Sequence, residues 1–153
     1  MEPTLPPDAE ETTLGIAFLD LARFARWAEL WDDREAAGLL QGFYDLTARR
    51  IEPAGGRIVK TIGDAVMFVF EPERCQDVVE ALHTLAGEVV SGAEARGLHT
   101  RLDAKVHVGP VVAGAFGPPG LERYDVFGRT VNDAARLRGE GIVLSPTVAE
   151  RLA

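Results

Sequence analysis

Two apolar runs within residues 55–70 flank a Gly-Asp pair. Such a pair between alternating apolar residues is the signal of a tight two-residue turn, so we expect an antiparallel β-hairpin here. Because side chains alternate between the two faces of a strand, Lys60 is expected to share a face with Ile58 and Ile62. Charged side chains are costly inside a core unless they are paired. Lys60 and the turn residue Asp64 therefore indicate either a cross-strand ion pair or a functional site.

The hydrophobic periodicity along the rest of the chain predicts alternating strands and helices. Further strands are expected at residues 14–21, 102–108, 111–116, 124–127 and 142–144. Helices are expected through Phe24 and Trp27 and over residues 33–51, 73–95, 130–137 and 146–152, and the helix at 130–137 begins with a capping-box-like segment. This order predicts an α+β sandwich in which helices pack on one face of a mostly antiparallel sheet. Residues 1–13, rich in proline and acidic side chains, are expected to form a flexible arm before a single domain over residues 14–153.

Composition narrows the class of protein. The 153 residues carry a formal net charge of −8 at pH 7. A general nucleic-acid binder needs a basic surface, whereas a nucleotide held through a metal ion is compatible with this charge. No apolar run approaches the length of a membrane span, and Met1–Thr13 lacks the pattern of a signal peptide. Because the single cysteine, Cys75, allows no internal disulfide, we expect a cytoplasmic protein.

An aspartate ends the first expected strand. Ile16, Phe18 and Asp20 share one strand face, so Asp20 continues an apolar stripe with a carboxylate. One interpretation is that Asp20 caps the helix that follows. The other is that Asp20 and Asp64 meet at neighbouring strand ends and form a site for a hard divalent cation, such as Mg²⁺ bound to the phosphates of a nucleotide.

A second group of polar residues lies on the helix expected at residues 130–137. Asn132 and Arg136 are four residues apart, so both side chains point the same way. They form either a solvated polar face or a pair that contacts sugar and phosphate. By contrast, His107 has no second histidine or cysteine at metal-ligand spacing and is expected to be structural. Cys75 has no neighbouring base in the sequence, which argues against a nucleophilic role.

Three segments of the chain strongly resemble the catalytic domain of class III adenylate and guanylate cyclases. They are residues 18–24 (FLDLARF), residues 55–65 (GGRIVKTIGDA) and residues 124–137 (YDVFGRTVNDAARL). The resemblance runs from about Leu14 to the end of the chain. It implies a ferredoxin-like βαββαβ core sandwich of the class III cyclase type and the activity of an adenylate cyclase, a phosphorus–oxygen lyase.

The resemblance also implies roles for the matching polar residues. Asp20 and Asp64 match the two aspartates that hold two divalent metal ions, Mg²⁺ or Mn²⁺, with the carbonyl of Leu21 as a further ligand. Lys60 and Asp125 match the pair that reads adenine.

Two further residues match the family's catalytic positions. Asn132 matches the residue that orients the ribose, and Arg136 matches the arginine that stabilises the transition state. In this family the metal aspartates come from one subunit and the other residues from its partner, so the resemblance implies a homodimer with two composite sites. The chain departs from the family at Arg23, where a glycine is usual, and in the further strands that usually follow, which can carry a phosphate-contacting lysine.

The choice of purine can be derived from hydrogen-bonding chemistry. Adenine presents an acceptor at N1 and a donor amino group at C6, and these complement a donor-only lysine and an acceptor-only aspartate. Lys60 and Asp125 therefore predict ATP over GTP as substrate. The expected reaction converts ATP to 3′,5′-cyclic AMP and pyrophosphate, by attack of the ribose 3′-hydroxyl on the α-phosphate. The alternatives are a catalytically weak or inactive ATP-binding and dimerisation module, a guanylate cyclase, and another nucleotidyltransferase.

Overall fold

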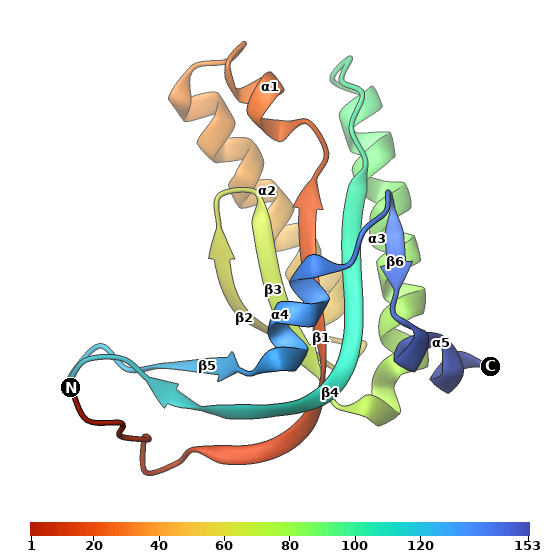
Figure 1. Ribbon diagram of the computed structural model, residues 1–153. Helices are drawn as coiled ribbons and strands as arrows, with labels where there is room; N and C mark the ends of the chain where they lie inside the picture. Colours follow the sequence, from red (N-terminus) through yellow and green to blue (C-terminus); the bar gives the residue numbers. More distant parts are fainter.

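A six-stranded sheet with helices on both faces forms the protein, as the computed structural model of residues 1–153 shows (Figure 1). The strands are β1 (Glu10–Leu21), β2 (Gly56–Ile62), β3 (Ala65–Phe70), β4 (Leu102–Phe116), β5 (Arg123–Phe127) and β6 (Ile142–Leu144). The helices are α1 (Phe24–Ala28), α2 (Asp33–Ile51), α3 (Cys75–Glu94), α4 (Arg129–Arg136) and α5 (Pro146–Leu152), with the 3₁₀ turn η1 (Pro72–Arg74) before α3. The predicted α+β class is confirmed. The expectation that helices pack on only one face of the sheet is wrong, because α4 packs on the face opposite α2 and α3.

The sheet has the strand order β2-β3-β1-β4-β5, and every neighbouring pair in that order is antiparallel. The short strand β6 pairs in parallel with β4 at Ala104–Val106. The expected hairpin is present, since β2 and β3 pair across the Gly63-Asp64 turn. The first strand, β1, thus lies in the middle of the sheet, and both of its neighbours hold it along much of its length.

Helices cover the two faces of the sheet unequally. The larger core lies between the sheet and helices α2 and α3, and Phe68, Leu82 and Leu85 are completely or almost completely buried there. The smaller core lies on the opposite face, where Ile16 and Val126 pack beneath Ala134 of α4. Figure 1 shows α4 lying across β1 and β4 on this face. Burial of these apolar surfaces is the main stabilising contribution to the fold.

One long strand replaces the two that were expected on either side of Gly109-Pro110. Strand β4 continues through Pro110, which faces Thr13 of β1. On its other side β4 pairs with β6 up to Val106 and with β5 from Val112 onwards. Pro110 lies in the gap between these two neighbours. There the absence of a backbone N–H donor costs the fewest sheet hydrogen bonds.

The N-terminal segment is more ordered at its end than a flexible arm over residues 1–13 predicts. Strand β1 begins at Glu10, so residues 10–13 already pair with β4. The carboxylate of Asp8 also accepts hydrogen bonds of 3.0 and 3.1 Å from the backbone amide of Ala115. Backbone pairing with β4, rather than composition, decides where this strand begins.

The expected capping box at α4 is wrong. The N-cap residue is Gly128, and no side chain caps the helix. The hydroxyl of Thr130 is buried and donates a 2.7 Å hydrogen bond to the carbonyl of Pro110, which anchors the start of α4 to β4. Across the whole chain, none of the helices combines the length and the apolar composition needed to cross a bilayer.

Candidate active site

Two aspartates lie at the same end of the sheet, as their positions in the sequence predict. Asp20 is the penultimate residue of β1, and Asp64 lies in the turn between β2 and β3. The carboxylate Oδ2 of Asp64 accepts a 3.2 Å hydrogen bond from the backbone amide of Leu21. The hydroxyl of Tyr44 on α2 donates to the carbonyl of Gly63 and holds the other side of the same turn. Both ends of the hairpin turn are thus tied to neighbouring elements.

The surroundings of Asp20 raise its pKa above the usual value of an aspartate. Partial burial is the largest cause, and the negative charges of Asp103 and Asp64 follow. Lys105 and Arg101 oppose the shift. Asp103 lies directly opposite Asp20 in the register of β1 and β4. The carboxylates of Asp20 and Asp103 repel each other in the absence of a cation. Such repulsion favours the binding of a cation beside them.

The alternative role of Asp20 as a helix cap is wrong. The N-cap residue of α1 is Arg23, three residues further on, and no side chain caps that helix. The carboxylate of Asp103 is already engaged, because it accepts hydrogen bonds of 2.7 Å from Nε of Arg101 and from the backbone amide of Gly141. The carboxylate of Asp20 has no hydrogen-bond partner within the chain and that of Asp64 has one, the amide of Leu21, so both could still bind a ligand at this end of the sheet.

This donor set suits a hard divalent cation. Carboxylate and carbonyl oxygens are the ligands that Mg²⁺ and Mn²⁺ prefer, and Mg²⁺ is commonly held by one or two carboxylates with substrate phosphates and water. Within one chain no three His, Cys, Asp or Glu side chains are arranged to hold a metal ion. A cation bound by Asp20, Asp64 and the carbonyl of Leu21 thus needs phosphate or water oxygens to complete its shell.

A lysine and an aspartate from opposite edges of the sheet meet in an ion pair. Nζ of Lys60 on β2 lies 3.0 Å from Oδ2 and 3.2 Å from Oδ1 of Asp125 on β5. The alternative of a cross-strand pair between Lys60 and Asp64 is therefore wrong. Beside this pair, the guanidinium of Arg57 lies 3.4 Å from the centroid of the Tyr124 ring, a cation–π contact that joins the same two strands.

A β-bulge explains why Lys60 reaches Asp125. The pairing of β2 with β3 shifts between Ile58 and Lys60, so Ile58 faces Phe68 and Lys60 faces Met67. Phe68 belongs to the large core, whereas Met67 belongs to the small core beneath α4. The extra residue at Val59 thus turns Lys60 onto the face opposite Ile58, and the expected shared face of Ile58 and Lys60 is wrong.

Asn132 and Arg136 lie on the exposed side of α4, one turn apart, as their spacing predicts. Neither side chain forms a hydrogen bond or ion pair within the chain. Nζ of Lys105 donates a 2.9 Å hydrogen bond to the carbonyl of Ala135 and so holds the last turn of α4 against β4. The structure thus positions the backbone that carries Arg136 and leaves its guanidinium free.

The same arrangement of segments occurs in a known family. The model of the adenylate and guanylate cyclase catalytic domain matches residues 7–153. The chain belongs to this family. It is a class III cyclase catalytic domain, of adenylate or guanylate type.

Relatives of both types are similar to this cyclase domain. An adenylate cyclase of Streptomyces coelicolor is 28% identical over 145 residues, which cover 91% of this chain and 34% of the relative. The soluble guanylate cyclase gcy-35 of Caenorhabditis elegans is 32% identical over 143 residues, which cover 88% of this chain and 20% of the relative. The cyclase domain thus spans about a third or less of these two relatives.

The fold is that of solved cyclase structures. The crystal structure of the adenylyl cyclase CyaB from P. aeruginosa superposes with a TM-score of 0.84 at 22% identity, covering 95% of this chain and 82% of that one. This likeness confirms the predicted class III cyclase fold, with its antiparallel sheet covered by helices.

The turn after β1 contains an unusual backbone conformation. Arg23 has φ of 66° and ψ of 16°, and it is the one non-glycine residue of the cyclase domain with positive φ. A side chain in this left-handed region is strained, whereas glycine adopts it freely. Such a turn favours glycine, which is the residue that the resemblance to the family leads one to expect at this position.

Two residues set aside on sequence grounds have structural roles. Nδ1 of His107 lies 2.8 Å from Oγ of Ser145, the residue that caps α5. Cys75 is buried, and burial raises the pKa of its thiol, which disfavours the nucleophilic thiolate.

The residues that sequence reasoning missed are Asp103 and Lys105. The alternation of apolar and polar side chains along β4 places both on one face. Their relation to Asp20 and α4 depends on the strand register and on the packing of the helix, which no local pattern reveals.

Proposed function

We propose that this cyclase domain is an adenylate cyclase that converts ATP to 3′,5′-cyclic AMP and pyrophosphate. The observation that carries the proposal is the contact between Lys60 and Asp125, at 3.0 and 3.2 Å. It joins a group that can only donate to a group that can only accept, which is the combination that the N1 and C6-amino edge of adenine requires. Guanine presents the opposite pattern and would leave both groups without a partner.

The position of the pair supports a role in recognition. The side chains of Lys60 and Asp125 are 41% and 21% exposed, so a base can reach them from solvent. The cation–π contact of Arg57 with Tyr124 holds β2 and β5 together next to the pair. A partly exposed ion pair adds little stability, which leaves ligand recognition as the better explanation for a lysine in this strand.

A homodimer with composite sites is part of the proposal. Within the chain, Arg136 forms no ion pair with Asp20 or Asp64. A second copy placed head to tail would supply an arginine to the metal aspartates. Phe127, the last residue of β5, is exposed over 47% of its surface and offers an apolar contact for that copy.

In this proposal each residue acts on a defined part of the substrate. Lys60 and Asp125 bind the adenine, Asn132 orients the ribose, and Arg136 faces the charge that develops on the α-phosphate oxygens. Asp20, Asp64 and the Leu21 carbonyl would hold two divalent cations, Mg²⁺ or Mn²⁺, which supply Lewis-acid activation of the 3′-hydroxyl and charge neutralisation of the triphosphate. We place the activity in the cytoplasm, where ATP is abundant and a lone thiol such as Cys75 stays reduced.

The proposal is tested by mixing two inactive variants. Asp64→Ala removes the metal half of a composite site, and Arg136→Ala removes the catalytic half. If subunits exchange at random, about half of the dimers are mixed and each has one intact site, so about a quarter of the wild-type rate should return. Cyclic AMP and cyclic GMP are measured separately, with ATP or GTP as substrate and Mg²⁺ or Mn²⁺ as metal.

The matched control is a mixture of Asp20→Ala with Asp64→Ala. Both changes damage the same half, so no mixed dimer has an intact site and the mixture should stay inactive. Recovery in this control, or none in the first mixture although both variants dimerise, contradicts the composite site. Cyclic GMP from GTP as the main product of the wild type would make the domain a guanylate cyclase, and ATP binding without any cyclic product would make it a binding module.

A further inference from the structure

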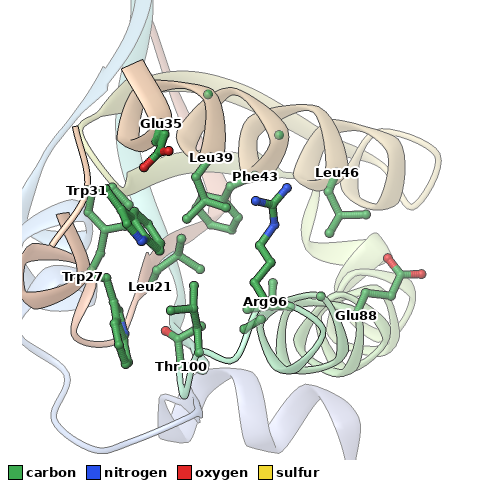
Figure 2. Close-up of a pocket in the computed structure, with 17 residues that line it drawn as sticks. Leu21, Trp27, Trp31, Glu35, Leu39, Phe43, Leu46, Glu88, Arg96 and Thr100 are labelled. Carbon is green, nitrogen blue, oxygen red and sulfur yellow. The ribbon is translucent and has the colours of Figure 1, made fainter. Parts of the chain in front are cut away.

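A pocket of about 670 Å³ lies between α1, α2 and the C-terminal part of α3 (Figure 2). It is on the side of the sheet that α2 and α3 cover, whereas Lys60 and Asp125 are associated with the opposite side. Leu21 lines the pocket with its side chain, so the pocket adjoins the end of β1 where Asp20 lies. Its volume falls within the range of about 300–1,000 Å³ that is usual for small-molecule sites.

The space exists because three helix positions that line it are glycines, which carry no side chain. Gly38 and Gly42 on α2 and Gly92 on α3 line the pocket, and a Cβ built on any of them would meet no atom within 4 Å. Glycine in the middle of a helix is unfavourable, and three of them facing one space leave a gap between two otherwise well-packed helices. The gap is walled by apolar and aromatic side chains, among them Leu39 and Phe43.

A cation lies at the open side of the pocket. Arg96 is exposed, its guanidinium forms no ion pair or hydrogen bond within the chain, and Figure 2 shows this side chain extending from the end of α3 toward α2 among the lining residues. Of the two lining carboxylates, Glu88 is already paired with Arg50. Glu35 lies in the first turn of α2, where a negative charge is favoured by the helix dipole.

A buried donor without a partner lies in the same wall. Nε1 of Trp27 is shut off from solvent and has no hydrogen-bond acceptor. A buried indole N–H normally finds a partner, so this wall is incomplete as it stands.

We propose that this pocket is a binding site for a small amphipathic carboxylate, with an aromatic or aliphatic body against Leu39 and Phe43 and its carboxylate on Arg96. A carboxylate matches the planar donor face of arginine. The apolar walls favour a body of low polarity. The site is separate from the nucleotide site and does not depend on cyclase activity.

The chain provides its own reporters for a binding test. It contains two tryptophans, Trp27 and Trp31, and both line the pocket. Excited at 295 nm, they report on occupancy in the presence of 5-phenylpentanoate, whose ring does not absorb there. We expect a saturable change in emission with a Kd below about 1 mM, and weaker binding of the neutral 5-phenylpentanamide and of the cationic 5-phenylpentylamine.

Matched variants locate the binding site. Gly92→Leu fills the pocket and should abolish the saturable change, whereas Gly87→Leu lies on the same helix in open space outside the pocket and should leave it intact. Arg96→Gln should weaken binding of the carboxylate by about fivefold to tenfold and leave binding of the amide unchanged. Circular dichroism confirms that each variant is folded.

Three results would overturn the proposal. They are the absence of a saturable change up to the solubility limit of the acid, an equal effect of Gly87→Leu and Gly92→Leu, and tighter binding of the amine than of the acid. The last result would assign the pocket to cations through Glu35 instead. None of these measurements requires nucleotide turnover, so they stand apart from the test of the cyclase reaction.

Discussion

The backbone amide of Leu21 donates a 3.2 Å hydrogen bond to Oδ2 of Asp64 and so joins the end of β1 to the turn of the β2–β3 hairpin. This contact predicts that Asp64 has a structural role in addition to its proposed role in metal binding. Asp64→Asn retains an acceptor for the Leu21 amide, whereas Asp64→Ala leaves that amide without one.

We therefore expect both variants to lose cyclase activity but to differ in stability. Asp64→Ala should lower the free energy of unfolding by about 1 kcal/mol, and Asp64→Asn should change it by less than half of that. Thermal melts in EDTA, compared with product formation in Mn²⁺, separate the two effects. Equal stability of the two variants would show that the contact contributes nothing.

Asp20 is expected to be unfavourable for stability in the absence of metal. Burial and the charges of Asp103 and Asp64 raise its pKa, which means that its ionised form is destabilised in the folded protein. Asp20→Asn should raise the melting temperature by ~2 °C in EDTA and abolish activity. Added Mn²⁺ should stabilise the wild type and not the variant. Asp133→Asn, an exposed aspartate on α4, is the control and should change neither quantity.

Exchange of the two base-reading residues should change the preferred nucleotide. In the double variant Lys60→Glu with Asp125→Gly, the carboxylate introduced at position 60 can accept hydrogen bonds from the N1–H donor side of guanine. The carboxylate at position 125, which would repel the O6 acceptor of guanine, is removed. The ratio of kcat/KM for ATP over GTP should fall by a factor on the order of 10² or more. The single variants leave one mismatch each and should be poor with both nucleotides. Strict ATP selectivity in the double variant would show that other residues read the base.

Removal of the α4 arginine should slow the chemical step more than it weakens substrate binding. Arg136→Ala deletes a charge that is proposed to act on the transition state, so kcat should fall by about 10²–10³ with little change in KM. Arg129→Ala, at the other end of the same helix and also exposed, should leave kcat within about twofold. An unchanged kcat in Arg136→Ala would make that residue an ordinary surface arginine.

Arg23 provides a test of backbone strain. Its φ of 66° places it in the left-handed region, which costs an L-residue about 1–2 kcal/mol. Arg23→Gly removes the strain but increases the freedom of the unfolded chain, so a net gain of about 0.5–1 kcal/mol is expected in urea unfolding. Arg23→Ala keeps the strain and serves as the control. A loss of stability in Arg23→Gly would mean that the arginine side chain contributes contacts that outweigh the strain.

Much of this protein follows from local patterns in the sequence. The alternation of apolar residues and the Gly-Asp pair predicted the β2–β3 hairpin, and helical spacing predicted α2 with its observed bounds, Asp33–Ile51. Both patterns arise because a strand or an amphipathic helix must bury one face. That requirement sets the spacing of apolar residues within a short segment of the sequence. The motifs around Asp20, Lys60 and Asn132 predicted the family, which is confirmed, while the roles of these residues stay predictions.

The tertiary structure decided which side chains meet. Lys60 and Asp125 are 65 residues apart, and a bulge at Val59 together with the packing of β5 against β2 brings them to 3.0 Å. Asp103 faces Asp20 because of the register of β1 and β4, and the pocket beside Leu21 exists because glycines on two separate helices face each other. Strand order, register and helix packing depend on contacts between distant segments, so no window of the sequence contains them.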